Sequence, residues 1–215
     1  MPDGTSTTAP RLAPRVRPGA PLRISDELQA WLDGDGEKAI GGLIEVFDKR
    51  AFAVIFVMLM GVPALPLPTG GATHVFEVVA VLLALQLVAG RDEIWLPRRW
   101  RARTFDTDGR FIRVLLGTIR RVERLSKRRL AFLFGHRLSN LVFGVLVAVG
   151  ATAAFLAPPF TGLDTLPALG VVLISLGVLL EDFAFVAVGA VVAAGGVLLE
   201  VVVGSAALKA LTGLL

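Results

Sequence analysis

The chain has 215 residues, of which 54% are hydrophobic and 19% are charged, and its formal net charge is +4. Soluble domains contain about 45–50% apolar and about 25% charged residues, so this composition argues against an ordinary soluble domain. The charges are also segregated, because residues 51–90 and 138–215 hold only six of the 40 charged side chains. This pattern predicts an integral membrane protein. The absence of cysteine excludes disulfides and thiolate sites.

The first 23 residues have the composition of a disordered tail. They are rich in Pro, Thr, Ala and Arg and contain no apolar run, so they lack the hydrophobic region of a secretory signal peptide. We therefore predict a disordered basic tail over residues 1–23. The membrane segments that follow it are expected to act as their own insertion signals.

Residues 24–50 are expected to form amphipathic helices in the cytoplasm or at the membrane surface. Ser25, followed by Asp26 and Glu27, favours a helix start, because acidic side chains stabilise the positive end of the helix dipole. The acidic, glycine-containing stretch 33–37 interrupts this helix. A second apolar face follows with the i, i+3, i+4, i+7 spacing of a helix, and it consists of Ile40, Leu43, Ile44 and Phe47.

Residues 51–92 are predicted to form the first membrane hairpin. The apolar stretch 51–62 is followed by three prolines within residues 63–68, which cannot continue an α-helix. A second apolar stretch runs over residues 75–89. A helix of 12 residues rises only about 18 Å, whereas the hydrocarbon core is about 30 Å thick. The hairpin therefore either spans the membrane with its helices extended by neighbouring residues, or re-enters and turns inside the membrane.

Residues 93–137 are predicted to form a basic cytoplasmic linker with an amphipathic helix. Residues 98–137 hold 13 Lys or Arg and three acidic side chains, and positive segments stay in the cytoplasm. The expected apolar face consists of Ile112, Leu115, Ile119, Val122 and Leu125. The basic side chains, which suit anionic lipid or a partner, are Arg113, Arg120, Arg121, Arg124, Lys127, Arg128 and Arg129. The alternative is that these charges only set the topology of the membrane segments. Nucleic-acid binding is not expected beside membrane segments.

Residues 138–182 are predicted to form a second membrane hairpin with the same plan. An apolar stretch from Asn140 is broken by Pro158 and Pro159, and a second stretch ends before Glu181. A shift of about 91 residues superimposes the two halves, as in transporter-like folds with broken helices. The alternative is that any two helical hairpins have prolines at their turns.

Residues 183–215 contain the last predicted membrane helix. Its apolar part, residues 183–203, is long enough to cross a membrane alone. Gly189, Ala193 and Gly196 place small residues on one face, which permits close helix packing and a homodimer.

These segments together predict an all-α polytopic membrane protein with four or five membrane segments. Two Pro/Gly-broken hairpins form an internal repeat and are joined by a basic cytoplasmic linker. The basic tail and linker place the N-terminus in the cytoplasm. The sequence leaves open whether each hairpin spans the membrane or re-enters it.

Three motifs give the chain a family resemblance. Residues 65–68 read Leu-Pro-Leu-Pro, residues 86–91 read Gln-Leu-x-x-Gly-Arg, and residues 95–98 read Trp-Leu-Pro-Arg. In this order they resemble the ExoD family of bacterial membrane proteins, named for exopolysaccharide synthesis, over roughly residues 36–205. Family members often carry Gly-x-Ser/Thr after the prolines, where residues 69–73 here read Thr-Gly-Gly-Ala-Thr. The resemblance implies an inner-membrane protein linked to exopolysaccharide production, without a defined reaction.

Ionisable groups inside a membrane are costly, so each is a candidate functional residue. His74 and Glu77 lie three residues apart on one helical face, at a helix N-terminus that can hold an anion or stabilise a carboxylate. We predict that both line a substrate or ion pathway, where Glu77 exchanges a proton or coordinates a cation with His74. A water-facing pair at the membrane surface is the alternative. The other predicted pathway residues are Thr69, Thr73, Asp164 and Thr161, with a helix N-cap as the alternative for Asp164.

Four further polar residues are predicted to have structural or coupling roles. Arg91 and Asp182 correspond under the 91-residue shift, so they either pair across the two halves or set the topology at the surface. Gln86 is expected to form a hydrogen bond with a neighbouring helix. Glu200 lies deep in the last span and is expected to face protein or water.

The sequence contains no nucleophile elbow, P-loop, HExxH or dinucleotide-binding motif. We therefore expect neither an enzyme, nor a cofactor, nor a metal site. The predicted function is a transporter or ion/proton-coupled exchanger that supports exopolysaccharide synthesis or export. The alternative is a non-transporting scaffold or regulator of the exopolysaccharide machinery, acting through the basic helix.

Overall fold

The computed structural model describes residues 24–34, 40–47, 50–65, 73–91, 93–97, 99, 110–126, 137–158 and 161–212. These residues form helices and no β-strand, which confirms the all-α prediction for the described part of the chain. The helices are α1 (Ile24–Asp33), α2 (Ile40–Phe47), α3 (Ala51–Gly61), α4 (His74–Val88), α6 (Arg110–Leu125), α7 (Arg137–Leu156), α8 (Thr165–Leu179) and α9 (Phe183–Thr212). The predicted tail over residues 1–23 lies outside the described residues.

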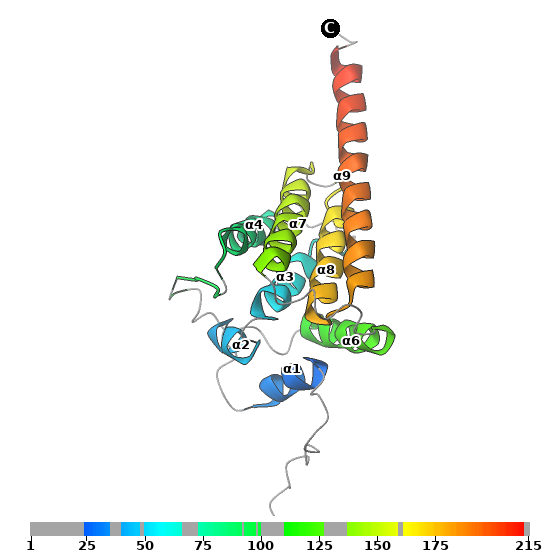
Figure 1. Cartoon of the computed structure of the whole chain (residues 1–215). Coiled ribbons are helices and arrows are strands. Elements are labelled where there is room, and N and C mark those ends of the chain that lie inside the picture. Colours follow the sequence, from blue (N-terminus) through cyan, green and yellow to red (C-terminus); the bar gives the residue numbers. More distant parts are fainter. Residues whose placement is uncertain are drawn as a thin grey trace, which may run out of the picture.

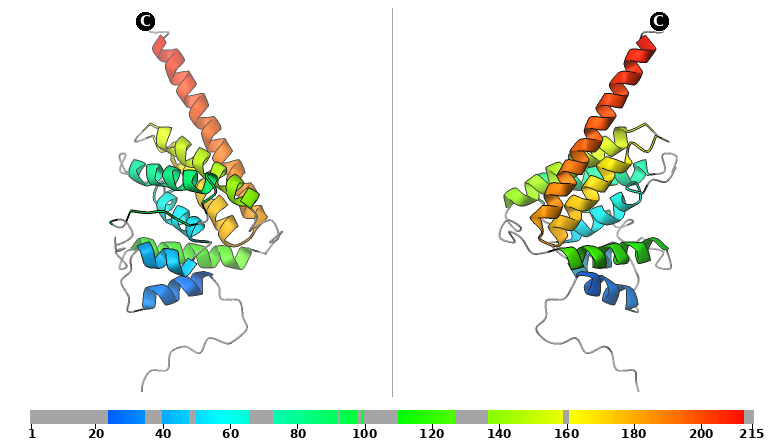
Figure 2. Two further views of the ribbon diagram at one scale, coloured as in Figure 1. Left: turned by 60° about the vertical axis from the view of Figure 1, so that its left-hand side comes forward. Right: turned by 90° about the vertical axis from the view of Figure 1, so that its right-hand side faces the viewer.

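The helices are arranged in two layers. An apolar bundle contains α3, α4, α7, α8 and α9, while α1, α2 and α6 lie across one end of it (Figures 1 and 2). The last turns of α9 extend beyond the opposite end and carry the C-terminus (Figure 1). Within the bundle α8 packs mainly along α9 and α4 packs mainly along α7, while α3 lies against α8. We call the layer of α1, α2 and α6 the polar layer, and the end of the bundle that it covers the polar end.

Two helices satisfy the length and composition of a membrane span. These are α7, with 20 residues, and residues 183–206 of α9. The apolar helices α3, α4 and α8 have only 11, 15 and 15 residues. The count of four or five membrane segments, and the choice between spanning and re-entrant hairpins, thus stay predictions.

Close packing of α8 against α9 depends on glycine. A Cβ atom on Gly170 would lie 2.5 Å from that of Ala193, and one on Gly189 would lie 2.6 Å from the backbone nitrogen of Ile174. A Cβ on Gly196 would likewise lie 2.5 Å from Pro167. Small residues let helix backbones approach closely, as the sequence indicated for α9. This small-residue face is occupied by α8, so it is not available to a second copy of the chain.

Helices α4 and α8 end in the same way, 91 residues apart. Their last residues are followed by a left-handed residue, Gly90 with φ 78° and Glu181 with φ 56°. After α4 the backbone N–H groups of residues 89–91 donate to carbonyls of residues 85–87. After α8 the N–H groups of residues 180–182 donate to carbonyls of residues 176–178, with the same pairing. Such C-caps are widespread, so the match agrees with the predicted repeat without excluding the simpler alternative.

The apolar side of α6 packs onto protein. Leu116 and Ile119 are buried in the same core as the bundle helices, whereas Leu125, which we expected on this face, is 73% exposed. Glu123 accepts hydrogen bonds from the backbone N–H and the hydroxyl of Ser25, and so joins α6 to α1. The expected apolar face is therefore wrong at Leu125, because the position of α1 selects which side of α6 is covered.

Candidate functional site

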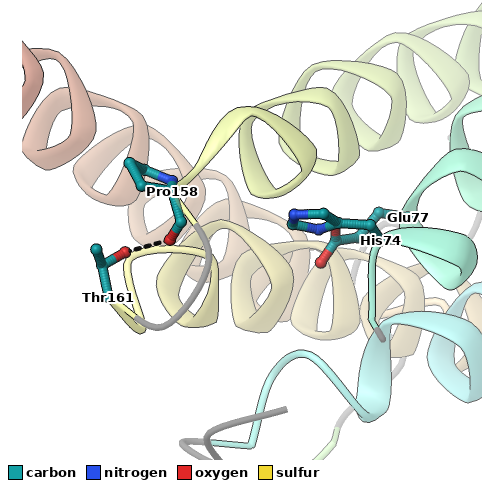
Figure 3. Close-up of polar contacts among 4 residues, drawn as sticks. All are labelled: His74, Glu77, Pro158 and Thr161. Atoms are coloured by element: carbon teal, nitrogen blue, oxygen red, sulfur yellow. Dashed lines mark hydrogen bonds and ion pairs between the residues drawn. The ribbon is translucent and has the colours of Figure 1, made fainter. Parts of the chain in front are cut away.

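The candidate site begins at the first turn of α4, after the first proline-rich break. Thr73 occupies the N-cap position and is buried, and its carbonyl accepts hydrogen bonds from the N–H groups of Phe76 and Glu77. His74 and Glu77 follow on one face of the helix, because residues three apart are neighbours on a helix surface. Figure 3 shows both side chains together at the start of α4.

Glu77 is the most constrained ionisable side chain of the bundle. It is 0% exposed, and its Oε2 lies 2.7 Å from Nδ1 of His74. Its second carboxyl oxygen, Oε1, is buried and has no hydrogen-bond partner among the residues that the structure describes. The His74 ring also meets the edge of Phe155 from the end of α7, with ring centroids 5.4 Å apart. A buried carboxylate that satisfies only one oxygen is costly, which is typical of a functional group.

Two more carboxylates lie near Glu77. Asp164 stands directly before α8, and Glu200 projects from α9, where its Oε1 is buried without a hydrogen-bond partner. The charge of Asp164 acts on both Glu77 and Glu200, and the charge of Glu77 acts on Glu200, so the three carboxylates lie within electrostatic range of one another. We call Glu77, Asp164 and Glu200 the carboxylate cluster. It brings together side chains from three separate elements.

Two of the predicted roles change in the structure. Asp164 holds the N-cap position of α8, but its side chain makes no cap hydrogen bond. Thr161 donates to the carbonyl of Pro158 at 2.6 Å and is exposed, away from His74 and Glu77 (Figure 3). It therefore orders the turn before α8, because a hydroxyl that bonds a nearby carbonyl closes a local turn. Thr69 lies outside the described residues.

Glu200 is the member of the cluster whose place the sequence did not reveal. Its sequence signal was a single carboxylate in a long apolar run. Gly196 packs against Pro167 at the start of α8, and Glu200 follows one helical turn later on the same side of α9. The packing of α8 on α9 thus delivers Glu200 to the beginning of α8.

At the polar end of the bundle, Arg91 and Asp182 have other contacts than those predicted. The expected pair of Arg91 and Asp182 does not form. Asp182 is buried and accepts hydrogen bonds from the hydroxyl of Ser126 and the N–H of Ala184. Arg91 is exposed, and the ion pair at this end joins Arg50 to Glu181 with an N–O distance of 3.0 Å.

Gln86 also differs from expectation. Its amide exchanges two hydrogen bonds with the backbone of Trp95, so it fixes the loop after α4 and not a neighbouring helix. Along α6, Arg120, Arg121 and Arg124 are exposed, and Arg120 donates to Gln29 of α1 at 3.2 Å. The side chain of Arg113, together with residues 127–129, lies outside what the structure describes.

Within the described residues, no three His, Asp or Glu side chains are grouped so that they could hold a metal ion. What the arrangement offers is a buried imidazole–carboxylate pair beside two further carboxylates.

Comparison with known families gives this arrangement a context. Residues 24–202 match the family model described as exopolysaccharide synthesis, ExoD. The chain belongs to the ExoD family. The match starts at α1, further toward the N-terminus than the motifs indicated, and includes the whole carboxylate cluster. Membership of the ExoD family implies a role in exopolysaccharide synthesis, and the two apolar helices suggest a membrane protein.

An uncharacterized protein of Synechocystis sp. is similar to this ExoD chain. The two are 29% identical over 165 residues, which cover 74% of this chain and 77% of that relative. No solved structure matches the chain.

Proposed function

We propose that this ExoD protein is a membrane transporter or ion-coupled exchanger that supports the synthesis or export of exopolysaccharide. The observation that carries the proposal is Glu77, a fully buried carboxylate with one unpartnered oxygen, in an apolar bundle. Ionisable residues inside a membrane mark substrate or ion pathways, because their desolvation is tolerated only for a function. The proposal includes no catalytic step and no cofactor.

The depth of the site supports this proposal. Thirteen residues separate the start of α9 from Gly196, which lies beside Pro167 at the start of α8. This length of helix rises about 20 Å, whereas the hydrocarbon core is about 30 Å thick. If α9 crosses the membrane from its first residue, α8 begins inside the hydrocarbon region. This favours hairpins that turn within the membrane, where surrounding protein can satisfy the exposed backbone.

The proposed orientation follows from charge. The layer of α1, α2 and α6 carries the exposed basic side chains Arg120, Arg121 and Arg124, and positive segments remain cytoplasmic. In the bacterial inner membrane this layer would face the cytoplasm, and α9 would extend toward the other side. The carboxylate cluster would then be reached from the side away from the cytoplasm.

Complementation with Glu77→Gln tests the proposed function. The variant removes the charge of Glu77 but keeps its shape, so we expect loss of secreted polysaccharide in a strain lacking the gene, at unchanged abundance in the membrane. Glu45→Gln is the matched control, because Glu45 is an exposed carboxylate on α2. Normal polysaccharide with Glu77→Gln would overturn the proposal.

A scaffold or regulator that acts through α6 is the second candidate. It is favoured by the exposure of three arginines on a helix whose apolar side is already covered by protein. Such a face suits anionic lipid headgroups or an acidic partner in the exopolysaccharide machinery. In the same assay, this function predicts that reversing Arg120, Arg121 and Arg124 to Glu abolishes polysaccharide, while Glu77→Gln has no effect.

A further inference from the structure

We infer that Glu77 and Glu200 form a proton-binding site between α4, α8 and α9, and that the proton bound there is the ion coupled to transport. The inference rests on the proposed function and names the ion and a second residue for it. Glu200 comes from a different helix and was expected to have a structural or coupling role and not to line the pathway.

The two glutamates share an unusual feature. Each has a buried Oε1 atom without a hydrogen-bond partner, although both side chains belong to a closely packed bundle. Leaving a buried carboxylate oxygen unpaired costs free energy, and the cost is largest when the group is charged. A proton on that oxygen removes the charge and so removes most of the penalty.

The surroundings of the pair favour a proton over other cations. On α4 the facing polar groups are Thr73 and His74, and before α8 the facing group is Asp164. Helix α7 contributes the ring of Phe155. In the described residues, no Lys or Arg forms an ion pair with the cluster and no three side chains are arranged for a metal. Carboxylates that repel one another bind protons, and their partner among the described residues is His74, which is cationic only when it is itself protonated.

The position of Glu200 on α9 makes it suited to this role. Its neighbours Leu198, Val201 and Val202 are exposed on the apolar surface, while Glu200 itself is partly buried on the inner side. The small-residue packing at Gly196 holds this part of α9 against α8. The packing of α8 on α9 therefore fixes where Glu200 lies relative to Asp164, directly before α8.

His74 is the polar side chain through which protons can reach Glu77. Its Nδ1 contacts Glu77 Oε2, and its side chain is 28% exposed, whereas Glu77 is not exposed at all. The imidazole can accept a proton on one ring nitrogen and donate from the other, so a proton taken from water is passed on without net change at His74.

Infrared spectroscopy of the purified, lipid-reconstituted full-length protein tests the site directly. Protonated carboxylic acids have a C=O stretching band that carboxylates lack. We expect such a band at neutral pH in the wild-type protein, to be lost in part in Glu77→Gln, in part in Glu200→Gln and almost entirely in the double variant. The band should persist in Glu45→Gln, and in Glu200→Asp it should be retained at a shifted frequency.

The outcomes separate the inference from the proposed function. Absence of the band in the wild type, or its full retention in the double variant, would overturn the proton site. If the band behaves as expected but Glu77→Gln and Glu200→Gln both give normal polysaccharide, the site binds a proton and the coupling to transport is wrong. Size-exclusion chromatography and circular dichroism of each variant ensure that a lost band does not come from misfolding.

Discussion

At the scale of single residues, Glu181 has a backbone conformation that its side chain disfavours. It is the one non-glycine residue with positive φ in the described part of the chain, and glycine stands at the matching position after α4. Left-handed backbone costs an L-residue about 1–2 kcal/mol. The Glu181 side chain forms the ion pair with Arg50, which connects the end of α8 to the start of α3. Strain is thus accepted at the point where the two hairpins meet.

We predict that Glu181→Gly is more stable than Glu181→Ala by about 1 kcal/mol, because a positive φ angle at residue 181 is strained for alanine but not for glycine. Both variants lose the partly exposed ion pair, which contributes about 0–1 kcal/mol, so the comparison isolates the backbone. Thermal unfolding of the two variants in the same detergent measures the difference. Equal stability would show that residue 181 is not strained.

At the scale of helices, the packing of α8 on α9 depends on backbone contact. Glycines on both helices lie where a single Cβ atom would meet a neighbouring backbone. A Cβ atom added at these glycines would meet backbone atoms, and backbone atoms cannot move aside by changing rotamer as a side chain can. The interface therefore discriminates strongly between positions on the same helix.

We predict that Gly189→Ala lowers the free energy of unfolding by about 1–3 kcal/mol, because the new methyl group would overlap the backbone of Ile174 and Gly170. Gly195→Ala is the control on the same helix, since a Cβ there meets nothing within 4 Å. It should be neutral or stabilising by up to about 1 kcal/mol, through the higher helix propensity of alanine. Denaturation in detergent compares the two, and a similar loss in both would contradict this packing.

At the scale of the whole molecule, the two ends of the bundle differ. Helices α1, α2 and α6 cover one end of the bundle, and α9 extends from the other (Figure 2). The ion pair of Arg50 with Glu181 and the hydrogen bond of Ser126 with Asp182 join the polar layer to the bundle. In the proposed orientation, α1, α2 and α6 lie on the cytoplasmic side and the end of α9 lies on the other.

Cysteine labelling can measure that direction, because the chain has no cysteine of its own. We predict that Thr212→Cys, at the end of α9, reacts with a membrane-impermeant maleimide from outside the inner membrane. Ala30→Cys, on the exposed side of α1, should react only after the membrane is permeabilised. Labelling of both from the same side would contradict the proposed orientation.

The local features of the molecule could be read from the sequence. Apolar runs and the intervening prolines predicted where helices begin and end, because helix formation depends on i to i−4 hydrogen bonds and proline removes one of them. The bounds of α3, α4, α7 and α8 agree with the predicted apolar stretches to within about three residues. The motifs after the first break identified the ExoD family. The pairing of His74 with Glu77 was also predictable, since both belong to one turn of one helix.

Only the tertiary structure decided which distant residues meet. It placed Glu200 within electrostatic range of Asp164 and Glu77, joined Asp182 to Ser126 in place of Arg91, and used the small-residue face of α9 for α8. It also turned Leu116 of α6 inward and left Leu125 exposed. Periodicity reveals which side of a helix is apolar or small, but not which helix covers it. That choice depends on the shapes of all helices packed together, and it is set by contacts between residues far apart in the chain.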